Sequence, residues 1–264
     1  MPTVRRVLAP NPGPFTGPGT NTWLLGDGPA RVLIDPGPDL DAHRQAVGRA
    51  LEGAALGVIL VTHDHLDHLA GAEALALEHH CRIARYPELA DGDEILVSGL
   101  SLQAIHTPGH APDHLSFWMA EDRVLFCGDL ILGQGSSVIA WPGGDVGDYL
   151  DSIARVAQLA PRMLFPGHFD PVLAAGPRIE ECRRHRLERE AQIAAALSPT
   201  AQDANQISRA VYGAELRSRP GAEQLHLAAL ASTRAHLEKL ERDGRAQRIL
   251  SAGPEPRWLL PEVG

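Results

Sequence analysis

A short apolar run that ends in a dense group of histidines and aspartates constrains this chain most. Residues 57–68 read GVILVTHDHLDH. The β-branched, apolar part predicts a strand that is buried on both faces. The strand is followed by imidazole and carboxylate side chains at His63, His65, Asp67 and His68. Borderline divalent metals such as zinc prefer these ligands. Four donors in six residues exceed what one tetrahedral ion easily takes from so short a stretch. The spacing therefore predicts two neighbouring ions, one at the first pair of donors and one at the second.

An apolar run followed by a turn and a potential ligand recurs three times further along the chain. The later ligands are His110, Asp129 and His168. In layered α/β folds, functional side chains gather where loops leave the strand ends, because rigid strands hold them in place. A single histidine at a strand end is more often structural, and a merely histidine-rich turn is the alternative for the first cluster. Four such strand ends in order predict one shared metal site.

Composition limits the class of protein. A chain of 264 residues with 44% hydrophobic residues suits one large domain, or a domain of about 200 residues with a small one. The net charge of −9 argues against non-specific nucleic-acid binding by the whole surface. Three widely spaced cysteines predict a reducing compartment. The sequence shows no signal peptide or membrane-length apolar run, so we expect a cytoplasmic protein without a membrane partner.

The predicted elements divide the chain into two domains, residues 1–197 and 198–264. In the first, helical spacing predicts one helix from Leu66 to about Glu78 and a polar helix over 177–197. In the second, we expect a helix that ends near Tyr212, a helix over 222–242, and short strands over 247–250 and 257–260. Helix, helix and hairpin is the outline of a winged helix.

Taken together, these residues resemble the metallo-β-lactamase superfamily. The resemblance covers residues 4–185 and rests on HxHxDH at 63–68, TPGH at 107–110, GD at 128–129 and PGH at 166–168. It implies an α/β fold, a four-layer αββα sandwich followed here by a small winged-helix domain. It also implies a dinuclear metal site in which Asp129 bridges the ions. The implied ligands are His63, His65 and His110 for the first ion, and Asp67, His68 and His168 for the second.

A finer resemblance is to the lactamase-β-like branch with a C-terminal winged helix, which includes a mitochondrial single-strand endoribonuclease. It rests on NPGPFT at 11–16, GTNT at 19–22, GDLILG at 128–133 and HRxxRE at 185–190. True β-lactamases have cysteine at the bridging position, so antibiotic hydrolysis is not expected. Cys127 is predicted to be a small buried hydrophobic residue. Glyoxalase II enzymes share the metal motif, but their Cys-Gly-Arg segment is replaced here by QGSSV at 134–138.

We therefore expect a metal-dependent hydrolase in which two divalent ions, zinc by expectation, share a bridging hydroxide. Asp67 would orient this nucleophile and Asp129 would hold the ions together as the second catalytic carboxylate. The best-guess substrate is a single-stranded RNA phosphodiester. The alternatives are a small ester or thioester, cleaved by a glyoxalase II-like thioesterase or a lactonase, and a non-catalytic winged-helix nucleic-acid binder. The metal motif does not distinguish an ester from a phosphodiester, because both need the same nucleophile.

Candidate substrate contacts come from outside the metal motif. The planar guanidinium group binds phosphate through two parallel hydrogen bonds, so we expect Arg186 or Arg189 to contact the substrate, together with Asn21. The alternative is that this arginine-rich helix face is simply solvated. Asp64, His106 and His114 border the ligands and are candidates for supporting hydrogen bonds or for solvated loop positions.

Overall fold

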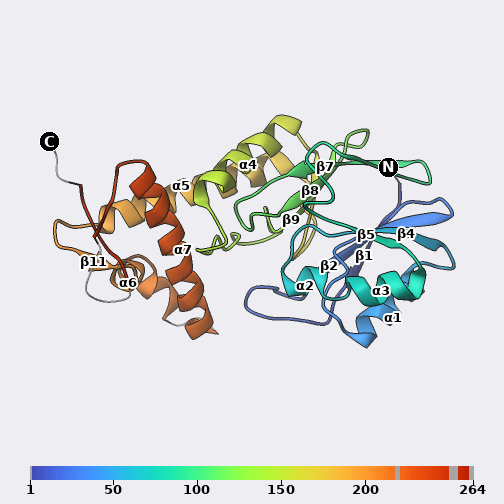
Figure 1. The fold of residues 1–264 in the computed structure, drawn as a ribbon, viewed down its shortest axis with the longest axis horizontal. Helices are drawn as coiled ribbons and strands as arrows, with labels where there is room; N and C mark the ends of the chain where they lie inside the picture. The colour runs from blue at the N-terminus through green and yellow to red at the C-terminus, as the bar shows by residue number, and fades with distance from the viewer. Residues whose placement is uncertain (1, 218–220, 250–254, 262–264) are drawn as a thin grey trace.

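Two stacked five-stranded sheets form the centre of the N-terminal part of the molecule (Figure 1). The computed structural model describes residues 2–217, 221–249 and 255–261. The first sheet has the order β1 (Val4–Leu8), β2 (Asn21–Leu25), β3 (Ala30–Ile34), β4 (Ala55–Leu60), β5 (Arg82–Ala84). The second has the order β10 (Met163–Pro166), β9 (Val124–Gly128), β8 (Leu115–Met119), β7 (Leu100–His106), β6 (Glu94–Val97).

Helices cover the outer face of each sheet. The first sheet packs against α1 (Asp41–Ala50) and α3 (Ala72–His79), and the second against α4 (Val146–Leu159) and α5 (Ala175–Ala196). In Figure 1 the two groups of helices lie on opposite sides of the paired sheets. The predicted four-layer αββα sandwich is therefore confirmed.

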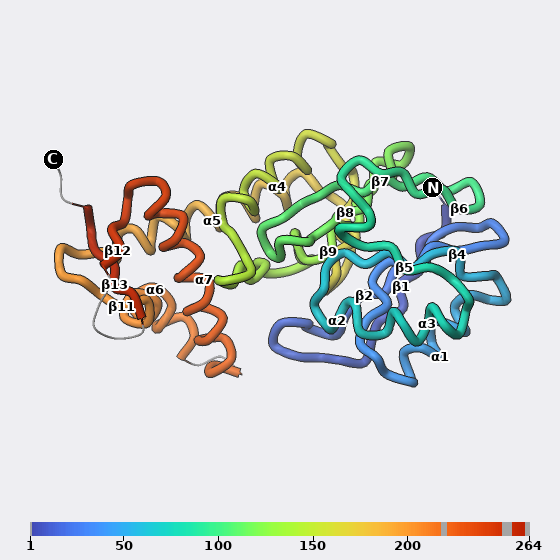
Figure 2. Tube along the Cα trace, viewed as in Figure 1, coloured from blue at the N-terminus to red at the C-terminus, as the bar shows by residue number. Residues whose placement is uncertain are grey.

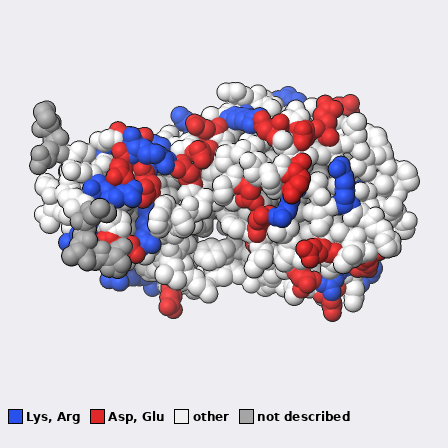
Figure 3. Space-filling view, viewed as in Figure 1, with Lys and Arg blue, Asp and Glu red and all other residues white. Residues whose placement is uncertain are grey.

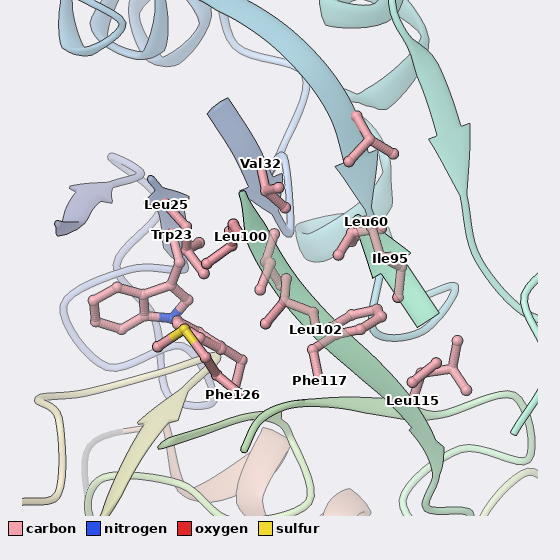
Figure 4. Packing of buried hydrophobic residues seen from close by; sticks show 14 of the residues in the cluster. Trp23, Leu25, Val32, Leu60, Ile95, Leu100, Leu102, Leu115, Phe117 and Phe126 are labelled. Carbon is pink, nitrogen blue, oxygen red and sulfur yellow. The ribbon is translucent and has the colours of Figure 1, made fainter. Parts of the chain in front are cut away.

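The alternation of side chains along each strand explains why the layers form. In β4, Val58 and Leu60 point into the core between the sheets, while Ile59 packs against α1 and α3. Because successive strand residues face opposite sides of a sheet, a strand of continuous apolar residues requires cover on both faces. Figure 4 shows the inter-sheet core, where Trp23 of the first sheet lies near Phe126 of the second.

The inter-sheet core also fixes the strand that leads to the last metal ligand. The Trp23 ring meets Phe165 edge to face, with ring centroids 4.9 Å apart. The Trp23 indole nitrogen donates a hydrogen bond of 3.0 Å to the Pro166 carbonyl oxygen. The first sheet therefore holds the end of β10, two residues before His168, in a fixed position.

The C-terminal part has a winged-helix arrangement. It contains α6 (Ala204–Leu216), α7 (Ala222–Arg242) and a three-stranded sheet with the order β11 (Gln202–Asp203), β13 (Arg257–Leu259), β12 (Gln247–Ile249). The last turn of α5 contributes Ile193 to the core of this part, which also contains Leu237 and Trp258. Helix α5 thus packs in both parts. The predicted domain boundary at residue 197 falls at the end of α5 and stays a prediction. Across the described chain, no helix is both long and apolar enough to span a bilayer.

Three local predictions differ from the structure. Strand β1 was not expected, because its sequence has no strict alternation. The predicted helix from Leu66 to about Glu78 is broken into α2 (Leu66–Leu69) and α3. The break lies at Gly71, where a Cβ atom would be 3.0 Å from the Pro36 carbonyl oxygen. Helix α6 continues past Tyr212 to Leu216. The predicted strands of the wing are confirmed over 247–249 and 257–259, and residue 250 lies outside the described residues.

A buried histidine lies inside the C-terminal part. His236 of α7 is fully buried, and neither imidazole nitrogen has a hydrogen-bond partner within the described chain. Burial, reinforced by the nearby positive charges of Arg186 and Lys239, lowers the pKa of His236 to about 2. The folded protein therefore keeps this imidazole neutral across the physiological range.

The buried imidazole makes the stability of the fold depend on pH. An unfolded histidine takes up a proton below about pH 6.5, while His236 in the folded state resists protonation down to a pKa of about 2. Acid therefore favours the unfolded chain. Between pH 7 and pH 5, the free energy of unfolding should fall by about 2 kcal/mol more in the wild type than in His236→Leu. Urea denaturation at both pH values measures this difference, with His226→Leu, near the start of α7, as the control. Equal losses in the wild type and His236→Leu would contradict the prediction.

Candidate metal centre

All seven predicted metal ligands come together at one edge of the stacked sheets, beyond the ends of β4, β7, β9 and β10. Their nitrogen and oxygen atoms form three overlapping groups, each with its donor atoms within 4.8 Å of one another. The groups are His63, His65 and His110; His63, His68 and Asp129; and Asp67, His68 and His168.

The donor atoms face one another rather than outside partners. In the first group, His63 Nε2 and His110 Nε2 lie 2.9 and 3.0 Å from His65 Nδ1. In the second ion's predicted group, the Asp67 carboxylate lies 3.3 Å from His168 Nε2. Converging ring nitrogens with a nearby carboxylate are the donor set that divalent transition metals bind.

The Asp129 carboxylate lies between the two groups. Its Oδ2 atom is 3.7 Å from His110 Nε2 on one side and 3.4 Å from His168 Nε2 on the other. Its Oδ1 atom is buried without a hydrogen-bond partner among the described residues. A buried, unpartnered carboxylate oxygen is costly unless something positive completes its environment. The residues therefore fit a pair of cations with Asp129 between them, and occupancy by two ions stays a prediction.

The buried carboxylate of Asp35 positions residues of the centre through hydrogen bonds. It accepts hydrogen bonds from the Thr62 backbone nitrogen at 2.8 Å, from the Thr62 hydroxyl at 2.9 Å and from His68 Nδ1 at 2.8 Å. The bond from His68 Nδ1 leaves His68 Nε2 directed at the centre. Asp35 lies at the end of β3, which pairs in parallel with β4, so the two strand ends meet. Sequence reasoning missed Asp35 because it reads as the first residue of an Asp-Pro-Gly turn, although its place beside the metal strand was a usable signal.

His114 supports the centre from the second sheet. Its Nε2 atom accepts a hydrogen bond of 3.1 Å from the Asp129 backbone nitrogen, so the proton of the neutral ring is on Nδ1. That Nδ1–H group donates to the Thr107 hydroxyl at 2.9 Å. This contact fixes the turn that carries Asp129. The other two bordering residues lie further out: Asp64 pairs with Arg85, and His106 stacks on Tyr86.

Electrostatics favour the cation-binding form at three of the ligands and the protonated form at His168. Burial lowers the pKa of His110 to about 4 and lowers the pKa of His63 well below its usual value. Burial disfavours a charged Asp129, but His168 and His68 outweigh this and hold the pKa of its carboxyl group well below the usual range. Burial likewise disfavours a charged His168, but Asp129 raises the pKa of that imidazole to about 9. Metal binding at His168 must therefore displace a proton.

One side of the centre opens into a cleft between the two parts of the molecule. The ligands that line this cleft are His65, Asp67, His110, Asp129 and His168. Its opposite wall is formed by α6 and α7 of the winged helix. The cleft holds about 1410 Å³, more than the roughly 300–1,000 Å³ of typical small-molecule sites. Figure 3 shows the surface hollowed between the two parts, with mostly uncharged atoms at its border.

The three predicted substrate contacts lie in supporting positions. Asn21 is fully buried, and its amide nitrogen donates to the Pro166 and Phe169 carbonyl oxygens at 3.0 and 2.7 Å, on either side of His168. Arg186 is only 3% exposed and donates to the Ser137 carbonyl oxygen at 2.7 Å. Arg189 lies over the Tyr212 ring and pairs with Glu215 at 3.1 Å. Both arginines border the cleft, but their hydrogen bonds are made within the protein.

Comparison with known proteins decides the family. The model of the metallo-beta-lactamase superfamily matches residues 15–91 and 87–168, more than half of the chain. The chain belongs to the metallo-beta-lactamase superfamily. The model of the beta-lactamase associated winged helix domain matches residues 221–258, so the predicted C-terminal winged helix is also confirmed.

Relatives and solved structures cover most or nearly all of the chain. A beta-lactamase-like protein 2 homolog from Caenorhabditis elegans is 34% identical, over 91% of this chain and 85% of the relative. A protein from Aspergillus chevalieri named atrochrysone carboxyl ACP thioesterase is 34% identical, over 76% of this chain and 68% of the relative. The crystal structure of a metallo-beta-lactamase family protein from Thermus thermophilus superposes with a TM-score of 0.76 at 26% identity, covering 98% of each chain. Members of the superfamily are generally hydrolases, and this chain has the histidine and aspartate groups that could hold a metal ion.

The hydrogen bonds of Asp35 predict the effect of replacing it. Asp35→Asn keeps the shape of the side chain but loses the charge that faces His68 Nδ1, so affinity for the second ion should fall about 10–100-fold. Titration of the metal-free protein with Co²⁺ measures this change. Asp64→Asn, which alters an exposed carboxylate one residue from His63 and paired with Arg85, should bind both ions like the wild type. An Asp35→Asn protein that binds two ions with wild-type affinity would refute the supporting role.

Proposed function

We propose that this protein hydrolyses an ester or thioester that has a large apolar acyl group. The observation that carries the proposal is the lining of the cleft. Beside the metal centre, its walls are formed mainly by apolar side chains, including Phe15, Leu132, Val138, Leu225 and Leu227. Burial of apolar surface against such walls favours an acyl chain by roughly 0.8 kcal/mol per methylene group.

The cleft is bounded by two contacts between the superfamily domain and α7, one at the start of the helix and one near its middle. On one side, the loop before β2 reaches α7, and a Cβ atom at Gly221 would lie 3.2 Å from Pro14 Cγ. Figure 2 shows this loop extending from the sheets toward the winged helix. On the other side, the Trp141 backbone nitrogen donates to the Ala231 carbonyl oxygen at 3.2 Å. An extended chain bound between these contacts would have one end beside the metal ligands.

The charges along the cleft disfavour a polyanion. Within the described lining, the arginines already have partners: Arg178 pairs with Glu181, Arg186 binds the Ser137 carbonyl oxygen and Arg189 pairs with Glu215. Further carboxylates, among them Asp64 and Asp113, also face the cleft. A phosphodiester backbone would approach these acidic groups, while Arg178 and Arg189 are already paired with carboxylates and Arg186 is only 3% exposed. The name of the Aspergillus chevalieri relative, a thioesterase, supports the same choice.

The chemistry follows from the positions of the centre's residues. When bound, a pair of divalent ions supplies an acidified water as nucleophile and stabilises negative charge on the carbonyl oxygen. Asp67, whose side chain is 31% exposed at the cleft, is placed to accept a hydrogen bond from that water and so to orient it. The apolar walls hold the acyl chain and exclude bulk water. The reaction adds one water across the acyl bond and gives a carboxylic acid and a thiol or alcohol.

Single-stranded RNA is a second candidate because of two exposed aromatic rings. Phe15 and Trp141 are 44% and 42% exposed and both line the cleft. Aromatic side chains in such positions can stack on unpaired bases at about 1–3 kcal/mol per base. The phosphodiesterase interpretation therefore has structural support, although the charges of the cleft count against it.

A substrate comparison tests the proposal. The metal-loaded protein is given acetyl, hexanoyl and decanoyl thioesters, bis-p-nitrophenyl phosphate and a short single-stranded RNA. We expect kcat/KM for the thioesters to rise at least tenfold from acetyl to decanoyl, because each added methylene buries more apolar surface. RNA cleavage with inert thioesters would overturn the proposal in favour of the second candidate.

A variant in the cleft wall tests the role of α7. Leu227 is 64% exposed and lines the cleft. Leu227→Asp should raise KM for the decanoyl thioester about tenfold and leave turnover of the acetyl thioester nearly unchanged, because a charge there opposes burial of the chain. Leu77→Asp, at a leucine that is 76% exposed on α3, is the matched control. Equal kinetics in both variants would show that α7 does not bind the acyl group.

A further inference from the structure

Arg186 on α5 is buried in an unusual environment. Its guanidinium group donates to the Ser137 carbonyl oxygen at 2.7 Å, to the Ser136 hydroxyl at 3.2 Å and to the Ser232 hydroxyl at 3.5 Å. Its central carbon lies 5.1 Å from the centre of the Tyr149 ring. These neighbours are neutral, and burying a charge among neutral groups costs stability unless each hydrogen bond is well made. Stability alone therefore gives no reason for an arginine at this position.

The loop that Arg186 binds also contacts a metal ligand. The carbonyl oxygen of Val138, the residue after Ser137, accepts a hydrogen bond of 2.7 Å from His110 Nδ1. That bond places the proton of the ring on Nδ1 and directs Nε2 at His65 Nδ1, 3.0 Å away. The partner of the outer nitrogen of a ligating histidine fixes both its tautomer and its orientation. The position of the Val138 carbonyl therefore decides whether His110 can serve as a ligand.

Side chains hold this loop in place. Residues 134–138 lie outside the helices and strands of the described chain. Arg178, two turns before Arg186 on α5, donates to the Leu132 carbonyl oxygen at 3.1 Å and also to the Gly135 carbonyl oxygen. The Ser137 hydroxyl donates to the Leu130 carbonyl oxygen at 3.1 Å. The Arg186 bond and the Ser137 hydroxyl bond both hold the residue adjacent to Val138, and the Arg186 bond ties that residue to α5.

The same arginine also contacts the winged helix. Ser232, its third partner, is on α7, and the neighbouring Ala231 carbonyl accepts the hydrogen bond from the Trp141 backbone. Arg186 therefore joins α5, the loop at 134–138 and α7 at one point. A shift of α7 changes the same set of contacts that positions His110.

We propose that Arg186 is a positioning residue, which links the winged helix to the metal centre through the Val138 carbonyl and His110. The proposal rests on the metal-dependent hydrolase activity but is independent of the substrate. Removing the guanidinium group frees the loop, loosens His110 and weakens binding of the ion predicted at His63, His65 and His110. The substrate-phosphate role expected from the sequence would instead affect only substrate binding.

Titration of the metal-free protein with Co²⁺, followed by its visible absorption, tests the proposal directly. Arg186→Met should weaken binding at the site that includes His110 about 10–100-fold and alter the Co²⁺ spectrum. Arg186→Lys keeps one donor for the Ser137 carbonyl and should give an intermediate affinity, at least threefold weaker than the wild type. Arg189→Met, which loses the Tyr212 and Glu215 contacts on the same helix, should bind Co²⁺ like the wild type.

Kinetics separate positioning from substrate contact. At saturating metal, Arg186→Met should lower kcat at least tenfold with KM changed less than twofold, on whichever substrate proves active. A raised KM with unchanged Co²⁺ affinity would overturn the proposal and restore the substrate-binding role. If Arg186→Met does not fold, Arg186→Lys tests the proposal instead. Wild-type Co²⁺ affinity and wild-type kcat in Arg186→Lys would also overturn the proposal. If no thioester is cleaved, the proposed substrate is wrong, but the Co²⁺ titration still tests the role of Arg186.

Discussion

The buried carboxylate of Asp35 is the contact on which the arrangement of the centre depends. It is 1% exposed and joins the end of β3 to Thr62 and His68. A carboxylate with so little exposure is stable only because three donors satisfy it. The parallel pairing of β3 with β4 places the two strand ends side by side and makes these bonds geometrically feasible. The core between the sheets then fixes β7, β9 and β10, which lead to the remaining predicted ligands, relative to that point.

The winged helix contributes to the cleft as well as to the fold. Helix α7 packs against α4, α5 and α6, and its residues between 224 and 232 line the cleft beside the metal centre. The C-terminal part therefore forms one wall of that cleft. Under the proposed function this wall contacts the acyl group, so the sandwich would supply the metal ligands and the winged helix would supply selectivity.

Much of the fold and of the metal site could be predicted from the sequence, because both depend on local patterns. The strand before His63 is continuous and apolar, which requires cover on both faces, and the predicted ligands lie in the segments that follow four strands. Asp35 was missed, and the hydrogen bonds of Asn21 and Arg186 could not be foreseen, because these contacts depend on partners far away in the sequence. Asn21 donates to carbonyl oxygens about 145 positions later, at Pro166 and Phe169. A polar side chain bonded to a distant backbone looks the same in the sequence as one that faces solvent. At the break between α2 and α3, the close approach of Gly71 to the Pro36 carbonyl oxygen likewise involves a residue distant in the sequence.

The central claim is that seven side chains hold two cations at the edge of the sandwich. Anomalous diffraction from crystals of the metal-loaded protein tests this claim most directly. The account predicts two peaks about 3.5–4 Å apart, one beside His63, His65 and His110, the other beside Asp67, His68 and His168, and Asp129 in contact with both. A single peak, or peaks bound by other side chains, would contradict it.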